Sequence, residues 1–86
     1  MDFVRLDRAD TVVTATRSLS PGSDIERIVT RATIPSGHKV ATQAMAMGDP
    51  VRKYAQIIGY ASCEILPGDH VHTHNVDFRN TDTDYE

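Results

Sequence analysis

Apolar and polar residues follow one another in short runs along this chain, and no apolar stripe with helical spacing extends beyond about two turns. Runs rich in β-branched residues predict strands, and the Gly, Pro, Asp and Ser residues between them favour turns. The predicted strands cover residues 3–6, 11–16, 24–30, 51–54, 56–63 and 70–76. The pattern therefore predicts a mainly β protein.

One spacing recurs four times: an apolar residue, two residues, a glycine, two residues and a second apolar residue. Glycine adopts positive φ without a steric penalty, so each copy predicts a turn with an apolar residue packing inward on either side. Proline lies one or two positions before the glycine in three copies and presets the entry to the turn. The copies are Leu19-Gly22-Ile25, Ile34-Gly37-Val40, Met45-Gly48-Val51 and Ile65-Gly68-Val71.

One short helix is predicted over residues 42–47, because Ala and Met there have good helix propensity and Gly48 ends the run. Residues 77–86 are polar and acidic without an apolar period, which indicates a flexible tail or a partner-dependent arm. We therefore expect one compact domain over residues 1–76, followed by an acidic tail over 77–86.

The size of the chain limits what it can enclose. A chain of 86 residues buries only about 60–65% of the surface that its unfolded form exposes. Apolar residues make up 40% and aromatic residues 6%, with no Trp, so the core must be small. A deep, enclosed active site is hard to build from this material. We expect any chemistry to be completed by another chain or by a second copy in a homo-oligomer.

The single cysteine, Cys63, excludes a disulfide within the chain. The sequence shows neither a signal-peptide pattern nor an apolar run long enough to cross a bilayer, so we expect a cytoplasmic protein that does not contact a membrane. Cys63 has no base beside it in the sequence, and its expected role is that of a small buried hydrophobe rather than a nucleophile.

The formal charge of −3 conceals an uneven distribution. Between residues 27 and 53 the basic residues face a single acid, Asp49, whereas acids dominate both ends of the chain. This basic part lacks interleaved aromatic residues, so a nucleic-acid partner is not predicted. A small anionic ligand and a plain solvated face both fit the pattern. The basic residues concerned are Arg27, Arg31, Lys39, Arg52 and Lys53.

The stretch 67–75, Pro-Gly-Asp-His-Val-His-Thr-His-Asn, holds three of the four histidines. In a strand over 70–76, alternation would place His70, His72 and His74 on one face, where three nitrogen donors could act near neutral pH. Three histidines cannot complete a metal shell alone, and there is no cysteine pair to add. Metal ligation, proton transfer and an unremarkable polar strand end all remain open.

Several sequence blocks carry a family resemblance. Gly-His-Lys at 37–39, Gly-Asp-Pro-Val-Arg-Lys-Tyr at 48–54 and His-Thr-His-Asn at 72–75 lie in register within residues 33–76. Together they resemble the small N-terminal domain of altronate and galactarate dehydratases. That domain is the SAF type of β-clip fold, and it also occurs as a separate small subunit in such lyases and in sulfolactate sulfo-lyase.

The resemblance implies a compact, mainly β, SAF-like β-clip domain. Its implied function is that of a small subunit or N-terminal domain of a carbon–oxygen lyase that acts on an anionic hydroxy-acid and is inactive without a large catalytic chain. A divalent metal, Fe²⁺ or Mn²⁺, would be shared with that chain. The alternatives are the small subunit of a sulfolactate sulfo-lyase and a non-catalytic binding or assembly module.

The resemblance also implies roles for individual residues. His72 and His74 are expected to transfer protons or to bind the metal. Lys39 is expected to bind the substrate carboxylate through a charge-assisted hydrogen bond. His38 and Asn75 complete the expected substrate-binding residues.

Overall fold

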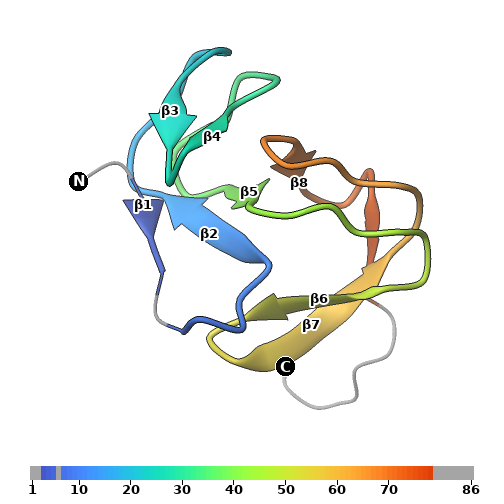
Figure 1. Ribbon diagram of the computed structural model, residues 1–86. Helices are drawn as coiled ribbons and strands as arrows, with labels where there is room; N and C mark the ends of the chain where they lie inside the picture. Colours follow the sequence, from blue (N-terminus) through green and yellow to red (C-terminus); the bar gives the residue numbers. More distant parts are fainter. Residues whose placement is uncertain (1–2, 6, 79–86) are drawn as a thin grey trace.

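Short antiparallel strands form all of the regular secondary structure in the computed structural model, which describes residues 3–5 and 7–78 (Figure 1). The strand order is β1-β2-β5-β8 in one sheet, β3-β4 in a second and β6-β7-β9 in a third. The described residues contain no helix, and the expectation of a mainly β domain is confirmed. The strands are β1 Phe3–Val4, β2 Val12–Ala15, β3 Asp24–Ile25, β4 Ile28–Val29, β5 Lys39–Ala41, β6 Pro50–Lys53, β7 Gln56–Ala61, β8 His70–Val71 and β9 Val76–Asp77.

The repeated turns are confirmed in all four copies. Each glycine has positive φ, between 84° and 92°. The residue after each glycine donates its backbone N–H to the carbonyl three positions earlier, for example from His38 to Pro35 at 3.0 Å. This bond and the positive φ define a type II turn with glycine at its third position. All eight flanking apolar residues are buried, so the turns bring the chain back onto the core.

The four turns associate in two pairs. Leu19 bridges Ile34, and Met45 bridges Ile65, in each case through two backbone hydrogen bonds of 2.8 Å. Each pair contributes to its own apolar cluster. The first cluster contains Val12, Ala41, Met45, Val51, Ala61, Ile65, Val71 and Val76, and the second contains Val13, Ala15, Leu19, Ile25, Ile34 and Val40.

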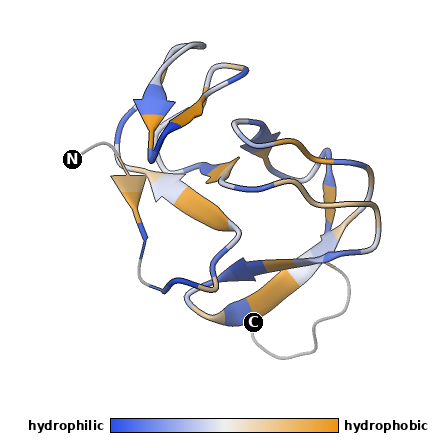
Figure 2. Ribbon diagram, in the orientation of Figure 1, coloured by the Kyte–Doolittle hydropathy of each residue, from blue (hydrophilic) through white to orange (hydrophobic). Residues whose placement is uncertain are grey.

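The central pair of strands, β2 and β5, separates the two apolar clusters. Val12 and Val13 are consecutive residues of β2, yet they point into different clusters, as the pleat of a strand requires. Val40 and Ala41 of β5 divide in the same way. Figure 2 shows the apolar residues of β2 at the middle of the molecule and a further apolar run along β7, beside the more hydrophilic β6.

The helix predicted over residues 42–47 is wrong. Met45 pairs with Ile65 in an isolated bridge, and the N–H of Ala46 donates to the carboxylate of Asp49 at 2.8 Å to cap the turn. Burying Met45, which is only 3% exposed, and pairing its backbone stabilise the extended form more than the modest helix propensity of Ala and Met stabilises a helix.

The strand predicted over residues 24–30 is interrupted by a turn. Residues 24–30 form the hairpin β3–β4, because Glu26 and Arg27 both adopt positive φ, at 49° and 69°. Tyr54 and Ala55 make a turn of the same kind between β6 and β7. Two consecutive residues with positive φ are typical of type I′ hairpin turns, which usually carry Asn or Gly. Without that signature, the first turn was not visible in the sequence.

The strand predicted over 70–76 is likewise wrong as one element, because a turn separates β8 from β9. Lys39–Ala41 forms β5, the strand between β2 and β8, although it was not predicted. This strand matters for function, since Val40 pairs with His70 and Lys39 pairs with Val71.

The ends of the predicted domain are only partly described. Asp77, which was assigned to the tail, pairs with Tyr60 through β9, and Phe78 follows it. Residues 79–86 and Leu6 lie outside the described residues, so the predicted tail and domain boundary stay predictions. Cys63 is exposed rather than buried, which corrects that expectation. Within the described residues, no helix is long and apolar enough to span a membrane.

Candidate functional site

Two copies of the repeated turn deliver histidines to the same place. His38 directly follows Gly37 of the second copy, and His70 follows Gly68 of the fourth copy by two positions. Antiparallel pairing of β5 with β8 sets Val40 opposite His70. The β-strand pairing therefore brings together two side chains that are distant in the sequence.

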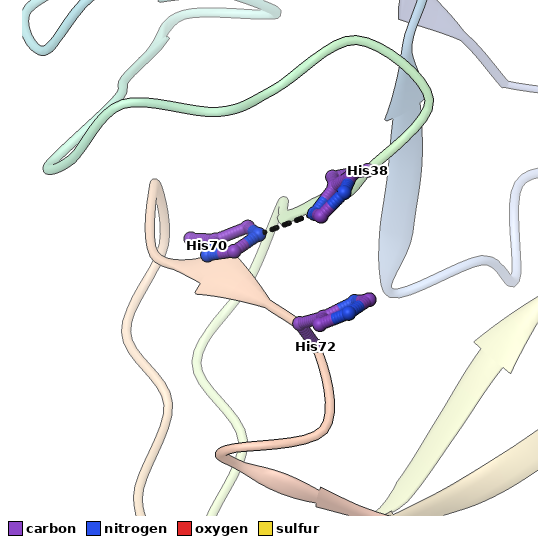
Figure 3. A group of neighbouring side chains, drawn as sticks. All are labelled: His38, His70 and His72. Atoms are coloured by element: carbon purple, nitrogen blue, oxygen red, sulfur yellow. Dashed lines mark hydrogen bonds between the residues drawn. The ribbon is translucent and has the colours of Figure 1, made fainter.

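His38, His70 and His72 form a group that we call the histidine cluster (Figure 3). The Nδ1 atom of His38 lies 2.9 Å from the Nε2 atom of His70, so one ring donates a hydrogen bond to the other. The ring of His72 stacks on that of His38 with 4.5 Å between centroids and on that of His70 with 5.7 Å. One ring nitrogen from each residue lies within 4.8 Å of the others.

The turn after β8 sets the position of His72. The side-chain carbonyl of Asn75 accepts a hydrogen bond from the His72 N–H at 3.0 Å, and its amide donates to the His70 carbonyl at 2.9 Å. The backbone N–H of Asn75 also donates to the His72 carbonyl at 3.1 Å. Asn75 is 5% exposed, so its side chain holds the backbone that carries two of the histidines. Its predicted contact with substrate stays a prediction.

The environment favours the neutral form of two imidazoles of the cluster, those of His70 and His72. The pKa of His70 is lowered from its ordinary value by burial, and then by the nearby His38, His74 and His72. The pKa of His72 is lowered by desolvation and by the neighbouring charges of His38, Lys39 and His74. A neutral imidazole retains a lone pair, so at neutral pH these side chains can accept a proton or bind a cation.

Lys39 gives the cluster a positive flank. It is partly buried in β5, and burial followed by the charge of Lys53 lowers its pKa. Lys39 is also among the charges that act on His72. A partly desolvated ammonium beside neutral imidazoles favours an anionic group such as a carboxylate.

His70 also lines an open pocket of about 340 Å³, of which Lys39 is not part. Two acids, Glu64 and Asp69, line this pocket together with His74. The carboxylate of Asp69 accepts a hydrogen bond from the Leu66 N–H at 2.8 Å and forms an ion pair with Arg31 at 3.4 Å. Because carboxylates repel anions, the Lys39 side of the cluster suits an anionic ligand better than the pocket does. Ala32, Cys63, His70 and Asn75 complete the lining.

The structure regroups the residues expected to form the site. His38 and His72 meet as members of one cluster, and Lys39 lies close enough to influence His72. His74 is outside the histidine cluster, and its ring lies tilted with its centre 5.3 Å from that of His70. His70, to which no individual role was assigned, lies at the centre. His38 and His70 follow the glycines of two repeated turns by one and two positions, and this nearness to the turns was the signal in the sequence that could have paired them.

Fold and site together define a small all-β module that displays a histidine cluster and a lysine at an open surface. The family model described as the altronate/galactarate dehydratase SAF domain matches residues 1–79. The chain belongs to this family.

Curated relatives fall into two groups. Altronate dehydratase from Escherichia coli (strain K12) is 33% identical over 88 residues, which cover 98% of this chain and 18% of that protein. Its counterpart from Bacillus subtilis (strain 168) is 34% identical over 77 residues, covering 85% of this chain and 16% of that protein. The chain thus spans less than a fifth of these enzymes.

A second kind of relative is much shorter. The (2R)-sulfolactate sulfo-lyase subunit alpha from Paracoccus pantotrophus is 48% identical over 56 residues, which cover 65% of this chain and 82% of that subunit. The relatives include both large dehydratases and a subunit of a lyase, so the module has homologues in a multisubunit enzyme.

Proposed function

We propose that this chain is the SAF module of a carbon–oxygen lyase that eliminates water from an anionic hydroxy-acid of the altronate or galactarate type. In this proposal it contributes residues to an active site that is completed by a large catalytic chain. The family membership supports the reaction class. A cytoplasmic location, expected from the sequence, is part of the same proposal.

One observation carries the proposal: the fold gathers His38, His70 and His72 at the surface and sets Lys39 beside them. A purely structural histidine group would be expected inside the core, whereas all three of these side chains are only partly buried. A partly exposed cluster with a cationic neighbour can contact a substrate that a second chain binds.

The chemistry of elimination assigns each group a task. A proton leaves the carbon next to the carboxylate, and the hydroxyl on the adjoining carbon departs as water after it receives a proton. Lys39 would bind the carboxylate, and His72 and His74 would transfer protons or contact the substrate. His38 would contact the substrate beside Lys39, and Asn75 would also help to bind the substrate. A divalent ion shared with the catalytic chain would act as a Lewis acid.

A second candidate function is supported by the sulfo-lyase relative, which has the higher identity, 48%, over the part that it matches. Elimination of sulfite from a sulfonated hydroxy-acid also begins with proton loss next to a carboxylate, so Lys39 and the histidines would keep their tasks. The two candidates differ only in the leaving group. Groups that recognise the far end of the substrate would belong to the catalytic chain.

The test is reconstitution. Neither the purified chain nor its catalytic chain should turn over altronate, galactarate or sulfolactate alone. The mixture of the two chains should turn over one of these substrates. The substrate that reacts distinguishes the hydro-lyase from the sulfo-lyase. Turnover by the small chain alone would show that it needs no second chain and would contradict the shared site. Full activity of the catalytic chain without it would also contradict the shared site and would favour a non-catalytic binding module.

A further inference from the structure

We propose that His38, His70 and His72 together bind one divalent transition-metal ion, each through one ring nitrogen. This inference deepens the proposed function, since it names the ligands that this chain supplies to the shared site. The ligand set differs from the pair expected from the sequence, because His38 and His70 join His72 and His74 does not take part. In this form of the proposal His38 and His72 hold the ion instead of contacting substrate or transferring protons, which leaves those tasks in this chain to Lys39 and His74.

The spacing of the nitrogens matches a shared ion. Two ligand nitrogens about 2.1 Å from one ion, at about 90° to each other, lie about 3 Å apart. The Nδ1 atom of His38 and the Nε2 atom of His70 are already 2.9 Å apart, and the ion would replace the hydrogen bond between them once the donor ring carries its proton on its other nitrogen. A ring nitrogen of His72 lies within 4.8 Å of both, and the His72 ring, now stacked on the other two, would turn to direct it at the ion.

The backbone around the cluster is already ordered. His38 lies at the end of a hydrogen-bonded type II turn, and its N–H donates to the Pro35 carbonyl. His70 and His72 flank Val71, which is fully buried. The side chain of Asn75 ties the backbone of both histidines together. Such support outside the ligand shell fixes ligand orientation and raises metal affinity.

The donor set indicates which ions fit. The group consists of imidazoles alone, and imidazole suits Fe²⁺, Co²⁺, Ni²⁺, Cu²⁺ and Zn²⁺. Mn²⁺ prefers carboxylate and water oxygens, so of the two metals expected from the resemblance Fe²⁺ is the better match to this chain's own donors. Three ligands leave coordination positions open, as catalytic metal sites require.

His74 provides the control within the same stretch of sequence. Its ring lies 5.3 Å from that of His70, but among the described residues it is outside the group whose nitrogens converge. His74 instead lines the pocket with Glu64 and Asp69. Loss of His74 removes an imidazole from the surface without removing a ligand.

The experiment titrates the 86-residue chain with Co²⁺ and follows the visible ligand-field absorption, with Zn²⁺ competition to obtain the affinity. Loss of outer-shell support alone costs about 10–100-fold in metal affinity. The single variants His38→Ala, His70→Ala and His72→Ala should each lose at least that much, whereas His74→Ala should stay within about twofold of wild type. Circular dichroism verifies that each variant is folded.

A second measurement needs no variant. In the wild-type chain, bound Co²⁺ should shift and broaden the ring proton signals of His38, His70 and His72 more strongly than those of His74. The inference is overturned if wild type does not bind Co²⁺, if the three variants bind as wild type does, or if His74 is affected as strongly as the cluster.

Metal binding and lyase function can fail separately. Normal Co²⁺ binding by a chain that never supports turnover would contradict the proposed function and leave the metal site standing. Turnover that is undiminished in chains unable to bind Co²⁺ would overturn the metal site and leave the lyase proposal intact.

Discussion

His38 Nδ1 and His70 Nε2 lie 2.9 Å apart, although 32 residues separate the two histidines in the sequence. Their contact depends on the pairing of β5 with β8 and on the two turns that precede these strands. The site is therefore a consequence of the repeated turns. Changes that disturb the turns should disturb the histidines as well, which links stability to function in this module.

Gly68 should be the least replaceable of the four turn glycines. Its φ is +92°, and a Cβ there would collide with the backbone carbonyl of Val29. Gly48 has the same φ, but a Cβ there would meet open space. We expect Gly68→Ala to cost about 2–4 kcal/mol and Gly48→Ala about 1–2 kcal/mol in free energy of unfolding, because only the first adds a clash to the strain. Urea denaturation measures both, and equal losses would contradict the close approach to β4.

Because residues 42–47 are not helical, replacing two methionines there should have very different effects on the free energy of unfolding. Met45 is 3% exposed and Met47 is 73% exposed. Met45→Ala should lower the free energy of unfolding by about 2–5 kcal/mol, and Met47→Ala should change it by less than about 0.5 kcal/mol. Similar effects of the two substitutions on the midpoint of thermal unfolding would argue against the bridge between Met45 and Ile65.

The repeated turns were predictable from the sequence because their chemistry is local. Glycine at a position of positive φ, with an apolar residue three positions to either side, defines each turn without reference to the rest of the chain. The failed helix at 42–47 shows the limit of propensity. Ala and Met favour a helix only weakly, and the pairing partner of Met45 lies 20 residues further along, at Ile65.

The site was predictable only in part, for the same physical reason. His72, His74 and Lys39 were identified from local motifs, but nothing local joins His38 to His70. That contact needs the register of β5 with β8, and β5 itself was not predicted, since Lys39–Ala41 is only three residues long. The turn at His72 also depends on the side chain of Asn75, which replaces a strand hydrogen bond with its own.

Asn75 should matter for both stability and metal affinity. Asn75→Ala removes the hydrogen bonds to the His72 N–H and the His70 carbonyl and leaves both groups partly buried without that partner. We expect a loss of about 1–3 kcal/mol in free energy of unfolding. Co²⁺ affinity should also fall, by about 10–100-fold, because the backbone of two ligands loosens. Thr73→Ala, at an exposed position of the same turn, is the control and should behave as wild type. Unchanged stability of Asn75→Ala would exclude this positioning role.

The stability of the metal-free chain should decline as the pH falls below about 6.5. The folded state lowers the pKa of His70 and His72 below the ordinary value of 6.5, so in acid the unfolded chain binds more protons than the folded chain. Proton uptake then favours unfolding, whereas well above pH 6.5 these two imidazoles are neutral in both states and the effect vanishes.

Urea denaturation in EDTA at about pH 5.5 and about pH 7.5 measures this dependence, in a range where carboxylates contribute little. His70→Asn should flatten it, since that variant lacks one of the depressed groups. A wild-type chain that is more stable at the lower pH would reverse the sign and contradict the lowered pKa values of His70 and His72.

Lys39 offers the sharpest test of substrate binding in the complex with the catalytic chain. A charge-assisted hydrogen bond to a carboxylate contributes about 1.5–3 kcal/mol, so Lys39→Met should raise the KM for the hydroxy-acid by about 10–100-fold, with a smaller effect on kcat.

Lys53→Met is the matched control, because it also removes one positive charge, and Lys53 lies near enough to Lys39 to lower the pKa of Lys39. The Lys53 ammonium lies 4.7 Å from the centre of the Tyr54 ring and has a partner of its own. We expect Lys53→Met to change KM by less than about threefold, as loss of a long-range, solvent-screened charge should. Equal effects of the two substitutions would mean that Lys39 acts only through the general positive potential and does not contact the carboxylate.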